Sequence, residues 1–279
     1  MLSSVNLGRR LQTVAEMVPD QARLGDIGTD HAYLPIWLYE QGKIKSAVGI
    51  DVHQGPYQSA REAVLNRNLT KQIEVRFGDG LNPLKPGEID TLTLAGMGGK
   101  TMLSILWERP DVLVRVSDLI LQPQGAERQV RIELLEAGWL LKNECLVEEE
   151  GRIYVVMAYS RNTGKDLAEL KQYEATWIER LSQEPGEEPE PLKTMGSLIV
   201  SSSDITWVIS KLFWQIGPLV LEEPNQELVS LISDQVNKLE KQLEQMKLAR
   251  DEAVLAKMEQ VRLDKMMLEG IKQWLLRLM

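Results

Sequence analysis

The chain of 279 residues contains one cysteine, Cys145, and only two histidines, His31 and His53. A single thiol cannot form an internal disulfide, and these residues are too few for a cysteine–histidine zinc site. No apolar run reaches the roughly 18 residues that a membrane-spanning helix needs. The amino-terminal segment has no apolar core after its positive charges, so it does not resemble a signal peptide. We therefore expect a cytoplasmic protein with no metal and no membrane contact.

Positive charge is also scarce. The formal net charge is −9, and residues 1–160 and 161–279 are each acidic overall. Nucleic acid is repelled by such a surface, so a nucleic-acid partner would have to meet a local basic patch. At this length, a hydrophobic content of 43% is enough for one full domain and a smaller second one.

The stretch LGDIGTDHAYLP, residues 24–35, reads as a strand, a tight turn and a helix that opens at Ala32. Gly28 lets a ligand approach the backbone closely. The carboxylates of Asp26 and Asp30 flank this glycine, so they would repel a pyrophosphate and attract an ammonium or sulfonium group. The turn therefore favours S-adenosylmethionine (SAM) over a dinucleotide. A plain acidic loop is the competing interpretation.

Two further carboxylates follow the next two predicted strands. Asp51 ends the second strand, residues 47–50, roughly 20 residues past the glycine turn, where doubly wound folds place an acceptor for ribose hydroxyls. The third strand, residues 73–77, runs into Asp79 and Gly80. Asp79 suits the adenine amino group of SAM, with Gly80 beside it, although Asp79 taken alone favours a surface turn.

The fourth predicted strand, residues 90–95, leads into GMGGKT, which begins at Gly96. Open α/β sheets bind ligands at the carboxyl ends of their strands, and glycine there leaves room for a ligand. A flexible turn is the alternative. The segment lacks the G-x-x-x-x-G-K-[ST] spacing of a phosphate-binding loop, which argues against a nucleotide triphosphatase.

Periodicity predicts the fold class. A first helix over residues 4–18, with Ser4 as its N-cap, precedes five strand–helix units and two long strands within residues 139–160. The expected fold is α/β, a Rossmann-like parallel sheet that closes with an antiparallel hairpin at its edge.

The second part of the chain has a helical pattern. Residues 161–216 read as a helical insertion that contains a linker rich in proline and glutamate at residues 184–193. Residues 217–279 read as a coiled-coil-like appendage. Its apolar stripe shifts near residues 248–252, so we expect a helical hairpin rather than one long helix that needs a partner chain. We therefore expect the protein to be a monomer or a weak dimer.

Five segments carry a resemblance to a known family: RLQTVAEMVP (10–19), GDIGTDHAYLP (25–35), FGDGL (77–81), LAGMGG (94–99) and LILQPQ (119–124). Together they resemble the bacterial tRNA (adenine(22)-N1)-methyltransferases, which are class I SAM-dependent methyltransferases. The resemblance covers residues 1–160 and resumes more weakly from Ile216. It implies a methyltransferase domain over residues 1–160, SAM as cofactor and tRNA as substrate. Residues 165–205 look like extra sequence.

The resemblance and the position of the turn both point to Asp30 as the catalytic residue. A carboxylate beside adenine N1 would stabilise the positive charge that methylation creates. The competing role for Asp30 is to cap the helix at Ala32. Tyr33 could stack on a flipped base, although packing in the core is the alternative.

Other substrate-binding candidates are polar or basic. Gln124 ends the LILQPQ segment, where relatives are expected to carry asparagine, so its contact with the substrate is open. Arg9 and Arg10 could contact phosphates, and so could Arg128 and Arg131; a solvated surface is the alternative.

Two other functions stay open at this stage. The acidic net charge also suits a SAM-dependent methyltransferase that acts on a small molecule or a protein. A noncatalytic RNA-binding or scaffold protein, in which the helical tail does the binding, is the third possibility. The fourth strand is not followed by an N-P-P-[YF] tetrapeptide, which argues against methylation of an exocyclic amino group.

Overall fold

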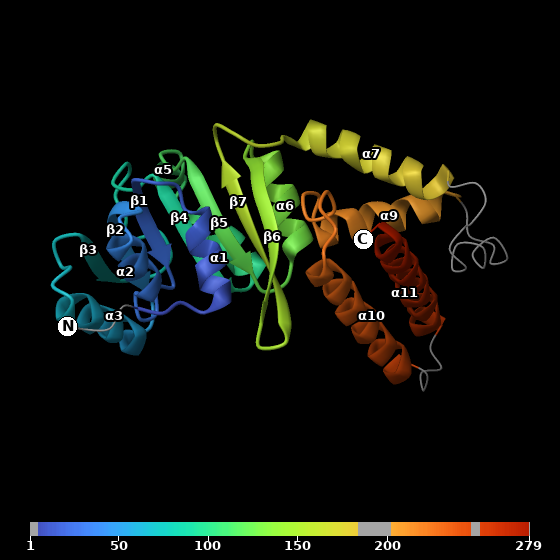
Figure 1. Ribbon diagram of the computed structural model, residues 1–279, viewed down its shortest axis with the longest axis horizontal. Coiled ribbons are helices and arrows are strands. Elements are labelled where there is room, and N and C mark those ends of the chain that lie inside the picture. The colour runs from blue at the N-terminus through green and yellow to red at the C-terminus, as the bar shows by residue number, and fades with distance from the viewer. Residues whose placement is uncertain (1–4, 184–201, 247–251, 279) are drawn as a thin grey trace. The chain divides into compact units, whose positions relative to one another are not determined.

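The computed structural model describes residues 5–183, 202–246 and 252–278 (Figure 1). The chain divides into two compact units, Met1–Leu167 and Ala168–Met279. The predicted linker at residues 184–193 lies outside the described residues, as does most of the predicted helix turn near 248–252. The division of the second part at residue 216 stays a prediction.

The first unit is built on a seven-stranded sheet with the order β3-β2-β1-β4-β5-β7-β6. Strands β1 to β5 are parallel, whereas β7 runs antiparallel to both β5 and β6. This confirms the predicted parallel sheet with an antiparallel hairpin at one edge. The strands are β1 (Ala22–Ile27), β2 (Ile44–Asp51), β3 (Ile73–Phe77), β4 (Thr91–Met97), β5 (Asp118–Pro123), β6 (Leu140–Glu149) and β7 (Arg152–Ser160).

Two groups of helices flank this sheet (Figure 1). Helix α2 packs on both α1 and α3, and α4 packs on both α5 and α6. Apolar side chains such as Val14, Leu34 and Ile36 fill a core between the first group and the sheet, and each contributes about 1.5–3 kcal/mol by burial. The helices are α1 (Arg9–Met17), α2 (Tyr33–Glu40), α3 (Gln54–Asn66), α4 (Gly99–Glu108), α5 (Pro110–Leu113) and α6 (Glu127–Glu136).

The predicted start of the first helix is wrong. Helix α1 begins at Arg9 with Gly8 as its N-cap, and Ser4 lies outside the described residues. No side chain caps Gly8, but Glu149 Oε1 accepts the Arg10 backbone N–H at 3.2 Å. A Cβ atom at Gly8 would overlap this carboxylate. The helix therefore starts where a distant residue satisfies its free N–H group.

The second unit is helical, with α7 (Leu167–Gln183), α9 (Ser202–Ile216), α10 (Gln226–Met246) and α11 (Glu252–Leu278). Trp177 lies in its core beside Phe213 and Trp274, at ring-centroid distances of 6.2 and 5.4 Å. Helix α11 runs back along α10 (Figure 1), and Lys265 pairs with Glu240 at 3.0 Å. This confirms that the second part of the chain is helical, as predicted. Among the described helices, none combines the length and apolar character needed to cross a membrane.

Candidate active site

The turn after β1 is tied to the end of β2. The N–H groups of Gly28 and Thr29 both donate to the Ile50 carbonyl, at 2.9 and 3.0 Å. The Asp30 N–H donates to Asp51 Oδ2 at 3.1 Å. Gly28 and Asp30 have φ angles of 74° and 52°, in a region that glycine adopts readily and aspartate less often. Hydrogen bonds to β2 therefore hold the conformation that presents Asp30.

Asp51 is buried at the carboxyl end of β2, with 6% of its surface exposed. Its second oxygen, Oδ1, accepts the His53 N–H at 2.9 Å. A carboxylate offers about four lone-pair sites, so both oxygens keep acceptor capacity after these two bonds. Asp51 can thus bind the two hydroxyls of a ribose while it holds the Asp30 backbone.

Asp26 lies beneath the turn, and only 5% of its surface is exposed. Its two oxygens accept the hydroxyls of Thr29 and Thr93, each at 2.7 Å. Burial raises the pKa of Asp26, and the negative charge of Asp51 raises it further, while the two hydroxyl bonds lower it in part. Thr29 fits there because residue 49 is glycine; a Cβ atom at Gly49 would lie 2.9 Å from Thr29 Oγ1.

Asp30 is exposed, with 68% of its side chain accessible, and His31 Nε2 lies 3.6 Å from its Oδ1. Helix α2 begins at Tyr33, and its N-cap, Ala32, has a φ of 55° with no capping side chain. The suggested role of Asp30 as a helix cap is therefore wrong.

Tyr33 does not pack in the core, the alternative that the sequence left open. It is 45% exposed and stacks on the His31 ring with a centroid distance of 5.2 Å and an interplanar angle of 19°. The apolar neighbours of Tyr33 suggested burial, but α2 buries Leu34 and Ile36 instead. Asp30, His31 and Tyr33 therefore form an acidic and aromatic surface beside the turn.

The third predicted acidic residue follows β3. The Gly78 N–H donates to the Asp51 carbonyl at 3.0 Å, which joins the ends of β3 and β2. Asp79 is exposed. Gly80 has a φ of 51°, and a Cβ atom there would lie 3.2 Å from Ile105 Cγ2. Asp30, Asp51 and Asp79 thus follow or end three neighbouring parallel strands at the same edge of the sheet.

Gly96, with a φ of 80°, interrupts the pairing of β4 with β5. A Cβ atom at Gly96 would lie 3.5 Å from Arg10 Nη1 and 4.0 Å from Gln124 Nε2. Gln124 is exposed, and its N–H donates to the Met97 carbonyl at 2.9 Å. The structure therefore gathers three of the predicted site residues, Gly96, Arg10 and Gln124, at the ends of β4 and β5.

Arg10 is held by contacts that sequence reasoning missed. Its Nη1 donates to Oε1 of the buried Gln122 at 2.7 Å, and its Nε pairs with Glu149 Oε2 at 3.3 Å. The guanidinium also lies 5.6 Å from the Tyr154 ring centroid. Glu149 and Gln122 are more than 100 residues from Arg10, and no local pattern predicts such pairs. Arg10 thus joins α1 to both β5 and β6.

The other candidate arginines differ in exposure. Arg9 and Arg128 are exposed. Arg131 is fully buried, and its Nε pairs with the equally buried Glu144, so the suggestion that Arg131 contacts phosphate is wrong. Removal of one partner from such a pair leaves an uncompensated charge, which costs about 3–5 kcal/mol. Arg131 thus belongs to the packing between α6 and β6.

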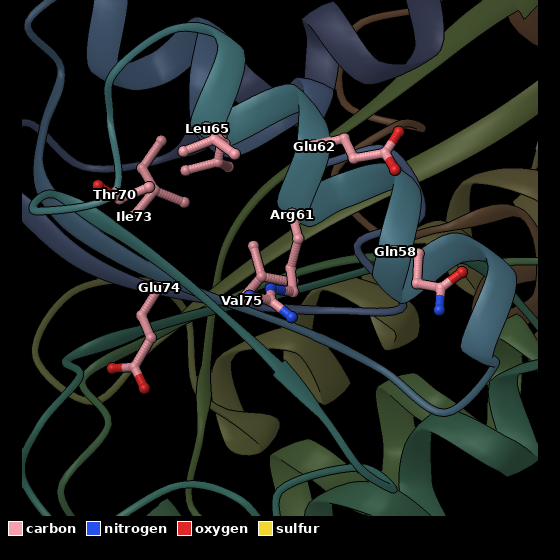
Figure 2. Close-up of a pocket in the computed structure, with 9 residues that line it drawn as sticks. Gln58, Arg61, Glu62, Leu65, Thr70, Ile73, Glu74 and Val75 are labelled. Atoms are coloured by element: carbon pink, nitrogen blue, oxygen red, sulfur yellow. The ribbon is translucent and has the colours of Figure 1, made fainter.

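The hollow shown in Figure 2, of about 580 Å³, lies between α3 and the edge strand β3. Arg61 reaches from α3 to Val75 of β3, and Glu74 points away (Figure 2). Thr70 and Ile73, near the amino end of β3, also line it. It contains none of the acidic residues described above. Within the described residues, no cluster of three or more histidine, cysteine or acidic side chains is arranged to hold a metal.

Residues 7–157 match the family model described as a methyltransferase domain. The doubly wound sheet, with its acidic residues and glycines at the carboxyl ends of the strands, is consistent with that class. Over 156 residues, 56% of this chain, the sequence is 40% identical to the tRNA (adenine(22)-N(1))-methyltransferase of Bacillus subtilis (strain 168), of which the match spans 66%. The chain belongs to the methyltransferase-domain family and, within it, to the bacterial tRNA (adenine(22)-N1)-methyltransferases.

Solved structures extend the likeness to the helical unit. The crystal structure of the B. subtilis m1A22 tRNA methyltransferase has a TM-score of 0.71 at 29% identity and covers 96% of this chain and 99% of its own. A putative tRNA (m1A22) methyltransferase of Streptococcus pneumoniae, solved in complex with S-adenosyl-L-methionine, has a TM-score of 0.65 at 30% identity and covers 95% and 100%.

Proposed function

We propose that this protein transfers a methyl group from SAM to N1 of the adenine at position 22 of tRNA. The observation that carries the proposal is the hydrogen bond from the Asp30 N–H to Asp51 Oδ2, at 3.1 Å. It joins the candidate catalytic residue directly to the candidate ribose-binding residue. The identity to the B. subtilis enzyme supports the choice of tRNA adenine N1 as the acceptor.

The residues at the strand ends fit SAM. Glycines at positions 28, 80 and 96 all have positive φ angles. A Cβ atom at Gly28 would lie 3.1 Å from Met97 Cε, so a larger residue at this position would crowd the Met97 side chain beside the turn. Asp51 would accept the ribose hydroxyls, Asp79 would accept the adenine amino group, and Asp26 and Asp30 supply negative charge for the ammonium and sulfonium groups.

Bound SAM supplies an electrophilic methyl group on a positively charged sulfur. Adenine N1 attacks through its own lone pair, so the protein needs no base to activate it. The N1–carbon bond forms as the carbon–sulfur bond breaks, and the positive charge passes from sulfur to the base. Asp30, exposed beside the turn, stabilises this charge or accepts a proton from the adenine amino group. Its backbone bonds to β2 fix its position before the substrate arrives.

The substrate side of the site combines stacking and charge. Adenine N1 is paired or otherwise enclosed in folded tRNA, so the base must leave its stack before attack. The exposed Tyr33–His31 pair offers a flat surface for that base, and Gln124 offers an amide at the ends of β4 and β5. Arg9 is exposed for phosphate contact, whereas Arg10 would have to release Glu149 or Gln122 to make one.

Calorimetric titration with SAM tests the cofactor site. The wild-type protein should bind SAM, and Asp51→Ala should weaken binding by about tenfold or more, the size of one hydrogen bond to a charged group. The exposed Asp20 provides a matched control, and Asp20→Ala should leave the affinity unchanged. A wild-type protein that binds no SAM would contradict the proposal.

Two expectations from the sequence stay predictions. A cytoplasmic location suits an enzyme that modifies tRNA, and a protein fused to a fluorescent reporter would test it. A monomer or weak dimer is expected because the helical hairpin pairs within one chain. Light scattering across a range of protein concentrations would measure the oligomeric state.

A further inference from the structure

A groove of about 470 Å³ lies within the helical unit, between α9, α10 and α11. This volume falls in the range of about 300–1,000 Å³ that small-molecule sites occupy. Leu212, Leu239 and Val261 give the groove apolar walls, and glutamines and lysines supply its polar groups. The groove belongs to neither the sheet nor the SAM site.

The charge of this groove is opposite to that of the whole chain. Three lysines and one carboxylate, Asp264, line it, whereas the chain carries a net charge of −9. Asp264 is already engaged, because it pairs with Lys211 and accepts a bond from Gln260 Nε2 at 3.0 Å. Lys238 and Lys257 are exposed, and neither forms an ion pair with another described residue. The groove is therefore a local basic patch.

An exposed tryptophan adjoins the lysines. Trp207 lies on α9 one turn before Lys211, and 53% of its surface is accessible. The Lys211 ammonium lies 5.4 Å from its ring centroid. Exposed aromatic rings beside basic side chains are the combination that proteins use to bind single-stranded nucleic acid, because every base has a face that can stack.

Amide groups complete the site. Four glutamines line the groove, Gln215, Gln235, Gln242 and Gln260. The Oε1 atom of Gln235 is buried and has no hydrogen-bond partner among the described residues. An unpaired buried acceptor costs about 1–3 kcal/mol. Rotation of the Gln235 side chain toward the groove would let a ligand donor, such as the amino group of a base, satisfy it.

We propose that this groove binds an unpaired nucleotide of the tRNA, with phosphates on Lys238 and Lys257, a base stacked on Trp207, and base edges against the glutamines. The proposal rests on the proposed function, because it takes tRNA as the substrate. It adds a second point of contact, which orients the tRNA independently of the SAM site.

The test compares two double variants that remove the same charge from the same helices. Lys238→Gln/Lys257→Gln changes the groove. Lys241→Gln/Lys272→Gln changes lysines of α10 and α11 that do not line it. Fluorescence anisotropy with a labelled tRNA transcript that carries adenine at position 22 measures affinity across salt concentrations. Circular dichroism and SAM titration verify that both variants are folded.

The groove variant should lower the slope of log affinity against log salt by about 1 per lysine. The control variant should change it less. An unchanged slope in the groove variant, or an equal change in the control, would overturn the proposal.

Two further measurements identify the ligand. Trp207→Ala should weaken binding of a short single-stranded oligonucleotide by about fivefold or more, and Trp207→Phe should restore most of it. A polyglutamate peptide serves as the competing probe. If the groove variant loses peptide binding but keeps its affinity for tRNA, the groove is a site for acidic protein segments and the proposal is wrong.

Failure of this proposal can be told from failure of the proposed function. A wild-type protein that binds tRNA without methylating it contradicts the proposed function. The groove proposal is then still decided by the tRNA affinities of the two double variants. A wild-type protein that methylates tRNA, with groove variants of equal affinity, contradicts only the groove.

Discussion

At the scale of single residues, the site depends on carboxylates in different surroundings. Asp30 is exposed, Asp51 is buried but keeps acceptor capacity, and Asp26 is buried with both oxygens occupied. Spacing from the glycine turn was enough to predict these positions, because strand ends in a parallel sheet fall at one edge. The different surroundings depend on Thr29 and Thr93, whose contacts with Asp26 cannot be predicted from spacing.

Asp30→Asn tests the catalytic role. We expect the methylation rate to fall by about 100-fold or more, since positioned acid–base groups contribute that much, while the SAM dissociation constant stays within about twofold. Single-turnover methylation of tRNA and SAM titration measure the two quantities, with Asp20→Asn as control. An unchanged rate would remove Asp30 from the catalytic machinery.

Asp26 allows a prediction about pH. Because burial raises its pKa, the folded state binds this proton more tightly than the unfolded state does. The free energy of unfolding therefore falls as pH rises from the unfolded pKa, about 3.9, to the folded one. Asp26→Asn removes this pH-dependent loss of stability. It keeps the hydrogen bonds to both threonines, since a hydroxyl can donate or accept.

The variant should therefore gain stability relative to wild type as pH increases. Thermal unfolding between pH 4 and 8 measures the difference in melting temperature. The same variant should bind SAM more weakly because the site loses a negative charge. A wild-type advantage in melting temperature that grows with pH would contradict the assigned direction of the pKa shift.

At the scale of secondary structure, local patterns were sufficient where neighbours in sequence decide the fold. The predicted range 73–77 coincides with β3. Local patterns were insufficient for α1, because a free backbone N–H group of its first turn donates to Glu149, which lies on β6. The sequence also left the exposure of Tyr33 open, because the apolar pattern of α2 does not indicate which turn faces the core.

Glu149→Gln tests how α1 is attached. The amide can still accept one bond but loses the ion pair with Arg10, so we expect a loss of about 1 kcal/mol in the free energy of unfolding. The adjacent and exposed Glu148 offers a matched control, Glu148→Gln. Urea unfolding measures both variants. Equal stabilities for the two variants would show that the Glu149 contact does not hold α1.

At the scale of the whole molecule, our two proposals assign the cofactor to one compact unit and part of the tRNA contact to the other. The candidate SAM-binding residues all lie within Met1–Leu167, and the basic groove lies within Ala168–Met279. A chain that ends at Leu167 should bind SAM with unchanged affinity and lose tRNA affinity by at least about tenfold, as expected when several phosphate contacts are removed. Titrations of both ligands measure this. Full tRNA affinity in the shortened chain would contradict the division.

The central claim is methylation of adenine N1 at position 22 of tRNA, and mapping the product tests it most directly. A methyl group on N1 blocks Watson–Crick pairing, so primer extension on tRNA treated with the protein and SAM should stop at position 22. Mass spectrometry of the digested tRNA should find 1-methyladenosine, and a transcript without adenine at that position should stay unmodified. Absence of 1-methyladenosine from treated tRNA, or its presence at another position, would contradict the account.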